Sequence, residues 1–237
     1  MTQLSISVPG AKAYSPRLLA VYDWLVLGVN ARLLWRCKPS EVLELYNLRV
    51  SNEHLDVGVG SGFFLDRCRF PSATPRICLF DLNTNSLGFA ATRIARYRPE
   101  THCGDVLAPL PFSEGRFGSV GMSALLHCLP GTIATKSIVF ANVARCMAAG
   151  APLFGCTVVN VPEHMHWLAR RVMTSLNRKG IFSNLGDKPE ELERALSQHF
   201  DAVKVRRVGC VAIFEARARA GKHAVSPATR TGGPATV

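Results

Sequence analysis

The segment His54–Phe64, with the sequence HLDVGVGSGFF, constrains the fold of this chain more than any other part of the sequence. An apolar run leads into three glycines at alternate positions, Gly58, Gly60 and Gly62. Glycines at such a turn let the main chain approach a ligand closely, because no Cβ atom stands in the way. The pattern predicts a strand, a tight glycine turn and a helix, which together form a nucleotide-binding βαβ unit.

Two carboxylates accompany this turn. Asp56 lies just before it, and Asp81 ends the next apolar run. In nucleotide-binding βαβ units, a carboxylate ~20 residues after the glycine turn accepts hydrogen bonds from the ribose. The dinucleotide fingerprint has its third glycine three positions after the second, which is position 63 in this chain. That position is Phe63, and the third glycine, Gly62, comes one residue earlier. Asp56 would also repel a pyrophosphate. The cationic cofactor S-adenosylmethionine suits an acidic turn, so the pattern predicts a methyltransferase rather than a dehydrogenase.

Length and composition agree with one α/β enzyme domain. The chain has 237 residues, of which 48% are hydrophobic. No apolar run reaches the roughly 18 residues that span a bilayer, and the N-terminus lacks the layout of a signal peptide. Eight cysteines are scattered without a C-x-x-C pair. We therefore expect buried free thiols, a cytoplasmic location, no membrane association and no metal site.

The net charge of +11 raises the alternative of an anionic partner. Residues 217–237 contain four basic side chains and no acidic one, and they are rich in Ala, Gly, Pro and Thr. This composition predicts a disordered basic tail. The remaining charge is spread along the chain without a dense Lys/Arg stripe, which favours a solvated basic surface over a nucleic-acid site. The oligomeric state stays open.

Strand-like and helix-like segments alternate along most of the chain, which predicts a parallel sheet with right-handed crossovers. Ser40, followed by acidic residues, is a candidate N-cap. We expect strands at His54–Val57, Arg76–Phe80, Thr101–Val106, Phe117–Ser123 and Pro152–Val159, and helices at Pro16–Trp35, Ser40–Leu48, Phe63–Phe70, Thr84–Tyr97, Ile133–Ala148 and Glu190–His199.

The C-terminal part departs from a plain dinucleotide fold. Two strand-like runs, Ala202–Val208 and Cys210–Ala216, are separated only by Gly209. So short a break permits either an antiparallel hairpin or one bulged strand.

The chain resembles the class I, S-adenosylmethionine-dependent methyltransferases of the small-molecule type, often called methyltransferase type 12. The resemblance covers roughly residues 14–216 and rests on HLDVGVGSGFFLDR, LFDLN, GDVLAPL, LLHCLPG and KGIFSN. It implies a Rossmann-like α/β fold whose seven-stranded, mostly parallel sheet ends in an antiparallel hairpin. It also implies an N-terminal helical lid (1–50), a cofactor-binding core (51–216) with an acceptor-covering insertion (160–186), and the basic tail (217–237).

The resemblance assigns cofactor-binding roles to ten residues. Asp105 has an alternative role in shaping the turn that follows it. Asp56, Gly58 and Gly60 would line the methionine end, Asp81 would hold the ribose, Leu82, Asn83, Asp105 and Val106 would surround the adenine, Ser123 would lie near the sulfonium, and Tyr14 could touch the methionine carboxylate.

Methyl transfer to a phenol needs help with one proton, because the phenol pKa is about 10. His127, in LLHCLPG, is the candidate catalytic base or acceptor contact, and bracing of its turn through backbone hydrogen bonds is the alternative. Tyr22, His164 and Trp167 are further candidates for acceptor contacts, with packing as the alternative for Tyr22.

The predicted function is methyl transfer to an oxygen, nitrogen or sulfur atom of a small hydrophobic or aromatic metabolite. Three alternatives stay open. The same fold serves RNA and protein methyltransferases, and it could serve a cofactor-binding cyclase or isomerase of natural-product assembly. A non-catalytic scaffold is the third, and the intact set of Asp56, Gly60 and Asp81 argues against it.

Overall fold

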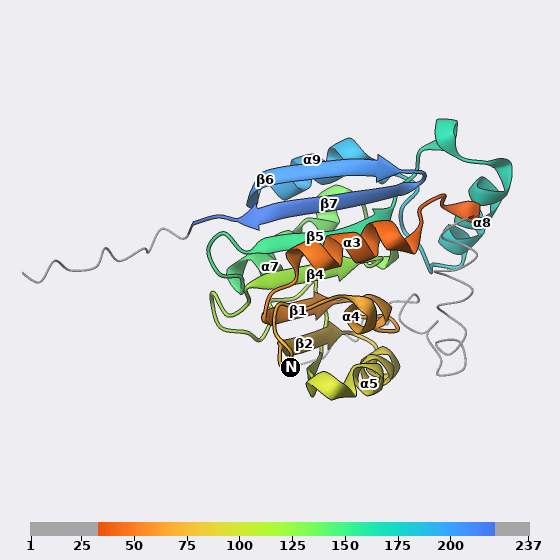
Figure 1. Ribbon diagram of the computed structural model, residues 1–237. Coiled ribbons are helices and arrows are strands. Elements are labelled where there is room, and N and C mark those ends of the chain that lie inside the picture. Colours follow the sequence, from red (N-terminus) through yellow and green to blue (C-terminus); the bar gives the residue numbers. More distant parts are fainter. Residues whose placement is uncertain (1–32, 221–237) are drawn as a thin grey trace, which may run out of the picture.

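The computed structural model describes residues 33–220, in which seven strands form one sheet (Figure 1). The strand order is β3-β2-β1-β4-β5-β7-β6, and β7 is antiparallel to both of its neighbours, whereas the other pairs are parallel. The predicted fold class is therefore confirmed. The strands are β1 (Glu53–Val57), β2 (Arg76–Asp81), β3 (Glu100–Cys103), β4 (Ser119–Ser123), β5 (Pro152–Val158), β6 (Phe200–Val208) and β7 (Val211–Ala218).

Helices cover the sheet on its two faces. Figure 1 shows α3 in front of the sheet and α9 behind β6, and α5 contacts β2 and β3. The helices are α3 (Pro39–Arg49), α4 (Phe63–Arg67), α5 (Thr84–Arg93), α6 (Ile133–Lys136), α7 (Ile138–Arg145), α8 (Trp167–Arg178) and α9 (Pro189–Ser197), with 3₁₀ turns η2 (Ala95–Tyr97), η3 (Leu126–Cys128) and η4 (Pro162–His164).

The strand order reverses between β1 and β4. The chain leaves β1 towards β2 on one side of the sheet, whereas β4 pairs with β1 on its other side. In an open α/β sheet such a reversal leaves a crevice beyond the carboxyl ends of the strands, because the two connections diverge there. The glycine turn that follows β1 lies at this point, so the topology places the predicted cofactor site in the crevice.

The helix predicted at Ser40–Leu48 is present as α3, but its cap differs. Lys38 is the N-cap and Pro39 opens the helix, because the fixed φ of proline suits the first helical position. Ser40 therefore lies inside the helix. Although α3 falls within the predicted lid range 1–50, its buried residues Val42 and Leu45 and its contacts with β5 and α4 make it a layer of the core.

Several predicted helices end earlier than the sequence pattern indicated, and the one expected at Thr84–Tyr97 ends at Arg93, where the 3₁₀ turn η2 follows. The first helix after the glycine turn ends at Arg67 rather than Phe70. The helix predicted over Ile133–Ala148 is divided into α6 and α7 at Ser137, whose hydroxyl donates a hydrogen bond to the carbonyl of Ala134. A serine that bonds a nearby carbonyl competes with the regular helix ladder, so the hydrophobic periodicity continues through the break.

The two C-terminal runs form an antiparallel hairpin. Gly209, with φ +58°, makes the turn between β6 and β7, which corresponds to the first of the two predicted arrangements. The register also shifts between Asp201 and Lys204. Strand β7 continues to Ala218, so the predicted tail range 217–237 is wrong at its start, because its first residues pair with β6 and β5.

Within residues 33–220, no helix is long and apolar enough to cross a membrane.

Candidate active site

The glycine turn links β1 to α4 and has the backbone that its sequence predicts. Gly58, Gly60 and Gly62 all have left-handed φ values of +73°, +52° and +72°. Gly62 is also restricted by packing, because a Cβ atom there would lie 3.0 Å from the Cβ of Ala90 on α5. At Gly60 a Cβ atom would meet nothing within 4 Å, so this residue borders open space where a ligand can approach the main chain.

A single pocket surrounds this turn. Nine of the residues assigned to the cofactor line it, and they come from the ends of β1, β2 and β4 and from the loop after β3. The nine are Asp56, Gly58, Gly60, Asp81, Leu82, Asn83, Asp105, Val106 and Ser123. The tenth, Tyr14, lies outside the described residues, as does the acceptor candidate Tyr22.

Asp81, at the end of β2, is a buried carboxyl group with a raised pKa. Its Oδ1 accepts a hydrogen bond from the backbone N–H of Asn83 at 2.8 Å. Burial raises the pKa of Asp81 to about 6, and hydrogen bonds from the backbone of Asn83, Val59 and Gly60 limit the rise. The carboxylate form therefore dominates at pH 7 and can accept hydrogen bonds from hydroxyl groups of a ligand.

Two of the pocket residues also stabilise the backbone around them. The side chain of Asn83 caps α5 by accepting hydrogen bonds from the N–H groups of Asn85 and Ser86. Asp105 Oδ1 accepts a hydrogen bond from the N–H of Leu107 at 2.9 Å, which is the turn-shaping role considered from the sequence. Because both side chains line the pocket as well, this role is compatible with ligand contact.

The end of β4 has a buried polar group, the hydroxyl of Ser123. It makes no hydrogen bond of good geometry within residues 33–220, and Tyr46 and Cys156 are the polar side chains within its reach. The next residue, Ala124, has φ +60°, a left-handed conformation that costs roughly 1–2 kcal/mol for a residue with a Cβ. Strained backbone of this kind often accompanies functional sites.

The rest of the pocket wall is mainly apolar, and its residues were not among the predicted site residues. Tyr46 from α3 is among them, and its hydroxyl donates a hydrogen bond to Asp56 Oδ2 at 2.8 Å. No local motif marks Tyr46, because its place in the pocket depends on how α3 packs on the sheet. The apolar wall includes Phe63, Phe64, Leu65, Leu125 and Leu129, with Cys128 beside them.

His127 lies beside this wall but faces the protein interior. Its Nδ1 is 3.2 Å from both Thr157 Oγ1 and the backbone nitrogen of Val158. Because Nδ1 accepts the Val158 N–H, the proton of the neutral imidazole is on Nε2. Burial, with a smaller contribution from Lys136, lowers the pKa of His127 to about 3. These contacts favour the bracing role of His127 over the catalytic one.

Two of the motifs that carry the family resemblance, LLHCLPG (125–131) and KGIFSN (179–184), pack against each other. The backbone N–H of Ser183 donates to the carbonyl of His127 at 2.8 Å, and the Phe182 ring lies 4.4 Å from the imidazole. Asn184 is fully buried and donates to the carbonyl of Val158. We call the contact between residues 125–131 and 179–184 the motif clamp. It attaches the 160–186 segment to the ends of β4 and β5.

A buried ion pair reinforces the motif clamp. Lys136 Nζ is 2.7 Å from Asp187 Oδ2, and both side chains are only 1% exposed. Lys136 also donates to the carbonyl of Ser183. Burial lowers the pKa of Lys136 and raises that of Asp187, and the hydrogen bond between them opposes both shifts.

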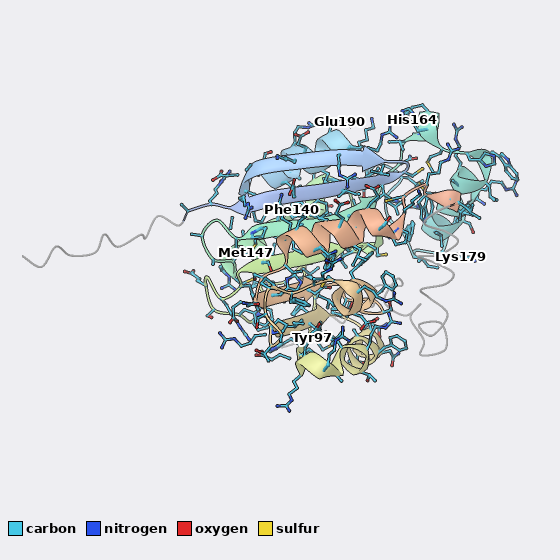
Figure 2. All side chains as sticks on the ribbon, in the orientation of Figure 1. Tyr97, Phe140, Met147, His164, Lys179 and Glu190 are labelled. Atoms are coloured by element: carbon cyan, nitrogen blue, oxygen red, sulfur yellow. The ribbon has the colours of Figure 1, made fainter. Side chains whose placement is uncertain are left out.

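The two acceptor candidates of the 160–186 segment are exposed. His164 lies in η4 at the outer rim of this segment, as Figure 2 shows, and Trp167 opens α8 with 62% of its surface exposed. Neither residue lines the pocket. Their role in acceptor binding stays a prediction.

The structure brings three groups of metal-ligand type together on β2 and β3, which the sequence did not indicate. They are Cys78, Glu100 and His102, whose candidate ligand atoms lie within 4.8 Å of one another. Glu100 is already paired with Arg116 at 2.6 Å, and burial raises the pKa of Cys78 to about 12. Because the Cys78 thiol is protonated and the Glu100 carboxylate is paired with Arg116, we assign no metal to this group.

Comparison with known proteins identifies the family of the chain. Residues 55–154 match a family described as "Methyltransferase domain". The chain is 38% identical over 209 residues to demethylluteothin O-methyltransferase of Streptomyces thioluteus, a match that covers 88% of this chain and 91% of that protein. It is 33% identical over 218 residues to the physcion biosynthesis cluster O-methyltransferase of Aspergillus chevalieri, with 91% and 98% covered.

A solved structure with the same fold is human N-acetylserotonin methyltransferase in complex with S-adenosylmethionine. The TM-score is 0.63 at 16% identity, with 91% of this chain and 60% of that chain covered. The chain thus belongs to the class I, S-adenosylmethionine-dependent methyltransferases. Within this class it is a small-molecule methyltransferase, and its cofactor is S-adenosylmethionine.

Proposed function

We propose that this methyltransferase transfers the methyl group to a hydroxyl oxygen of a small hydrophobic or aromatic metabolite. The observation that carries the proposal is the composition of the pocket. Acidic and glycine residues line it together with apolar residues, which include Phe63, Phe64, Leu125 and Leu129. Two relatives named O-methyltransferases, of which one belongs to the physcion biosynthesis cluster, support the choice of oxygen and of secondary metabolism.

Nine of the pocket residues fit the cofactor. Asp81 would hold the ribose, and Leu82, Asn83, Asp105 and Val106 would surround the adenine. Asp56 and the main chain at Gly58 and Gly60 would bind the methionine end, where open space at Gly60 admits a ligand. The buried hydroxyl of Ser123 would lie near the sulfonium. When bound, the sulfonium supplies a methyl carbon that is already activated for displacement.

The protein has two tasks in this reaction. It must align the acceptor oxygen with the methyl carbon, and such positioning can supply roughly 7–11 kcal/mol of the barrier. As the oxygen–carbon bond forms and the sulfur–carbon bond breaks, the hydroxyl proton must also leave. Since His127 Nδ1 already accepts a backbone hydrogen bond, we do not route this proton through His127. An aromatic hydroxyl has a pKa of about 10 and is mostly protonated at neutral pH, so its proton passes to a water or buffer base as the methyl group is transferred.

Mass spectrometry with a matched acceptor set tests the proposal. The purified protein is incubated with S-adenosylmethionine carrying a deuterated methyl group and with 2-naphthol, 2-naphthylamine or 2-naphthalenethiol, which differ only in the acceptor atom. Decahydro-2-naphthol, which has the hydroxyl but no aromatic ring, is the fourth member. We expect the labelled methyl group on 2-naphthol.

Each contrary result has a definite meaning. Label on the amine or the thiol alone would replace oxygen by that atom. Label on the saturated alcohol at an equal rate would remove the preference for an aromatic acceptor. A product of unchanged mass would indicate a cyclase or isomerase instead.

We also propose a cytoplasmic location, which the eight free cysteines support because a reducing compartment maintains thiols.

A further inference from the structure

We propose that Tyr46 and His54 are positioning residues that hold the carboxylate of Asp56 for the methionine end of the cofactor. This inference goes beyond the proposed function, since it concerns cofactor recognition and is independent of the acceptor. The three residues come from two elements that flank the pocket, α3 and β1. Figure 1 shows α3 lying across the front of the sheet.

Tyr46 makes the shorter of the two contacts. Its hydroxyl donates a hydrogen bond to Asp56 Oδ2 at 2.8 Å, and the residue is only 1% exposed. The ring is fixed by Phe64, stacked at 5.2 Å, and by Phe154, edge-on at 4.9 Å. Burial and the neighbouring Asp56 carboxylate raise the pKa of Tyr46 well above its usual value, so the hydroxyl remains a donor at neutral pH.

His54 approaches the same oxygen from the sheet. As residue i−2 on β1, it projects to the same face as Asp56, and its Nε2 is 3.5 Å from Oδ2. The imidazole is fully buried, and its Nδ1 lies 2.8 Å from Ser119 Oγ on β4. The contact with Asp56 is longer than an ideal hydrogen bond, so its contribution is mainly electrostatic.

Ser119 links His54 to a second serine. Ser119 Oγ accepts the backbone N–H of Ser51 and lies 2.9 Å from Ser51 Oγ, whose own hydroxyl donates to the carbonyl of Glu53. The Ser119 hydroxyl proton can therefore go to Ser51 Oγ or to His54 Nδ1. When it goes to His54 Nδ1, the imidazole proton on Nε2 faces Asp56, and Tyr46 and His54 both point a donor at one carboxylate oxygen.

The neighbouring strand is adapted to this arrangement. Gly121 on β4 pairs with Asp56 on β1. A Cβ atom at Gly121 would lie 2.8 Å from Asp56 Oδ2, 3.1 Å from the Tyr46 hydroxyl and 3.3 Å from His54 Cε1. A glycine inside a strand often marks such a close approach. The space above Gly121 is therefore filled by the three side chains at once.

The consequence concerns the other carboxylate oxygen. Because both donors contact Oδ2, Oδ1 remains available to a ligand in the pocket that Asp56 lines. A buried carboxylate that is fixed in orientation suits a cationic group, and the methionine end of the cofactor carries an ammonium and a sulfonium. An unfixed carboxylate would have to be ordered when the ligand binds, at a cost in affinity.

Calorimetry with three ligands and the variant Tyr46→Phe tests the proposal. S-adenosylmethionine and S-adenosylhomocysteine both carry the α-ammonium group, whereas 5′-methylthioadenosine has the same adenosine half without it. We expect Tyr46→Phe to weaken binding of the first two by about tenfold, the value of one hydrogen bond to a charged group. Binding of 5′-methylthioadenosine should be unchanged.

Two outcomes would overturn the proposal. An equal loss of affinity for all three ligands would mean that Tyr46 only maintains the shape of the pocket. Unchanged affinity for all three would mean that Asp56 needs no positioning. Thermal melting with and without ligand accompanies each titration, so that a loss of folding is distinguished from a loss of affinity.

Two further variants complete the experiment. Tyr97→Phe makes the same chemical change at a tyrosine that packs on Phe70 and Arg96 outside the pocket, and it should alter no affinity. His54→Phe preserves a buried ring but removes both nitrogens, and it tests the proposal without changing Tyr46. We expect a smaller loss, about threefold, for the two ammonium-bearing ligands only, because the contact is longer.

Discussion

The glycine turn and the motif clamp lie at the same end of the sheet, yet they arise from the sequence in different ways. The turn and its carboxylates come from two successive βα units, so the order of residues along the chain already predicts their arrangement. The motif clamp joins residues 125–131 to residues 179–184, which meet only after the chain has folded. A motif of the family resemblance can therefore mark a packing contact, whereas the glycine pattern marks the pocket.

The largest effect on stability is expected at the motif clamp, from Lys136→Met. This change leaves the buried carboxylate of Asp187 without its cation, and breaking such a pair costs about 3–5 kcal/mol. Urea denaturation followed by circular dichroism measures the loss. The double variant Lys136→Met/Asp187→Leu removes both charges and should recover most of it. A single variant as stable as the parent would show that the ion pair contributes nothing to holding the segment.

On the side of the glycine turn, Asp81→Ala should reduce affinity rather than stability. It removes the acceptor of the ribose hydroxyls, and each lost charge-assisted hydrogen bond is worth about 1.5–3 kcal/mol, although the losses do not add. Calorimetry with S-adenosylmethionine measures the change. Unchanged affinity would refute the ribose-binding role of Asp81.

His127 distinguishes the two regions most directly, because it was predicted as catalytic and lies in the motif clamp. His127→Phe leaves the buried N–H of Val158 without an acceptor, which should destabilise the fold by about 1–3 kcal/mol. His127→Asn can still offer an acceptor and should restore part of this loss. The turnover number on a confirmed acceptor, measured well below the melting temperature, should be little changed in either variant. A turnover number reduced more than a hundredfold with unchanged melting would restore the catalytic role.

The pKa of Asp81 predicts a pH dependence of cofactor affinity. The folded pKa is raised from 3.8 to about 6, and the ionised form is the one that accepts the ribose hydrogen bonds. Affinity should be constant above about pH 7 and should fall by up to about tenfold per pH unit as the pH drops below 6. In Asp81→Asn this dependence should disappear. A profile that is identical in the parent and the variant would assign it to another group.

The smallest effect is expected at the C-terminus. Deleting residues 221–237 leaves β7 intact, since that strand ends at Ala218. We expect the melting temperature and the affinity for S-adenosylmethionine to remain as in the full chain. A melting temperature lowered by many degrees would show that these residues contribute to the fold.

The sequence predicts the geometry of the glycine turn well because the signals there are local. The φ values of Gly58, Gly60 and Gly62 and the position of Asp81 at a strand end follow from residue type and order. The partners of Asp56 are different. Tyr46 reaches it only because α3 packs against the sheet, and a tyrosine on the buried face of a helix resembles any other core residue.

The same reasoning explains the differences in the secondary structure. Hydrophobic periodicity continues through Ser137, so it cannot show that a side-chain hydrogen bond to the carbonyl of Ala134 divides the helix. The burial of Asn184, in KGIFSN, could not be predicted either, because asparagine is a polar residue that is typical of exposed turns. Its partner, the carbonyl of Val158, belongs to a strand whose neighbours are set by the whole sheet.

The glycine at position 121 has a consequence for how such chains diverge. Three side chains, from Tyr46, His54 and Asp56, occupy the volume that a larger residue at Gly121 would need. Replacement of one member therefore changes the room and the donors available to the other three. We expect the four positions to vary together among related sequences, as a single inherited unit. A relative with a side chain at the position of Gly121 should also have lost the tyrosine or the histidine, and it should recognise the methionine end of the cofactor by other means.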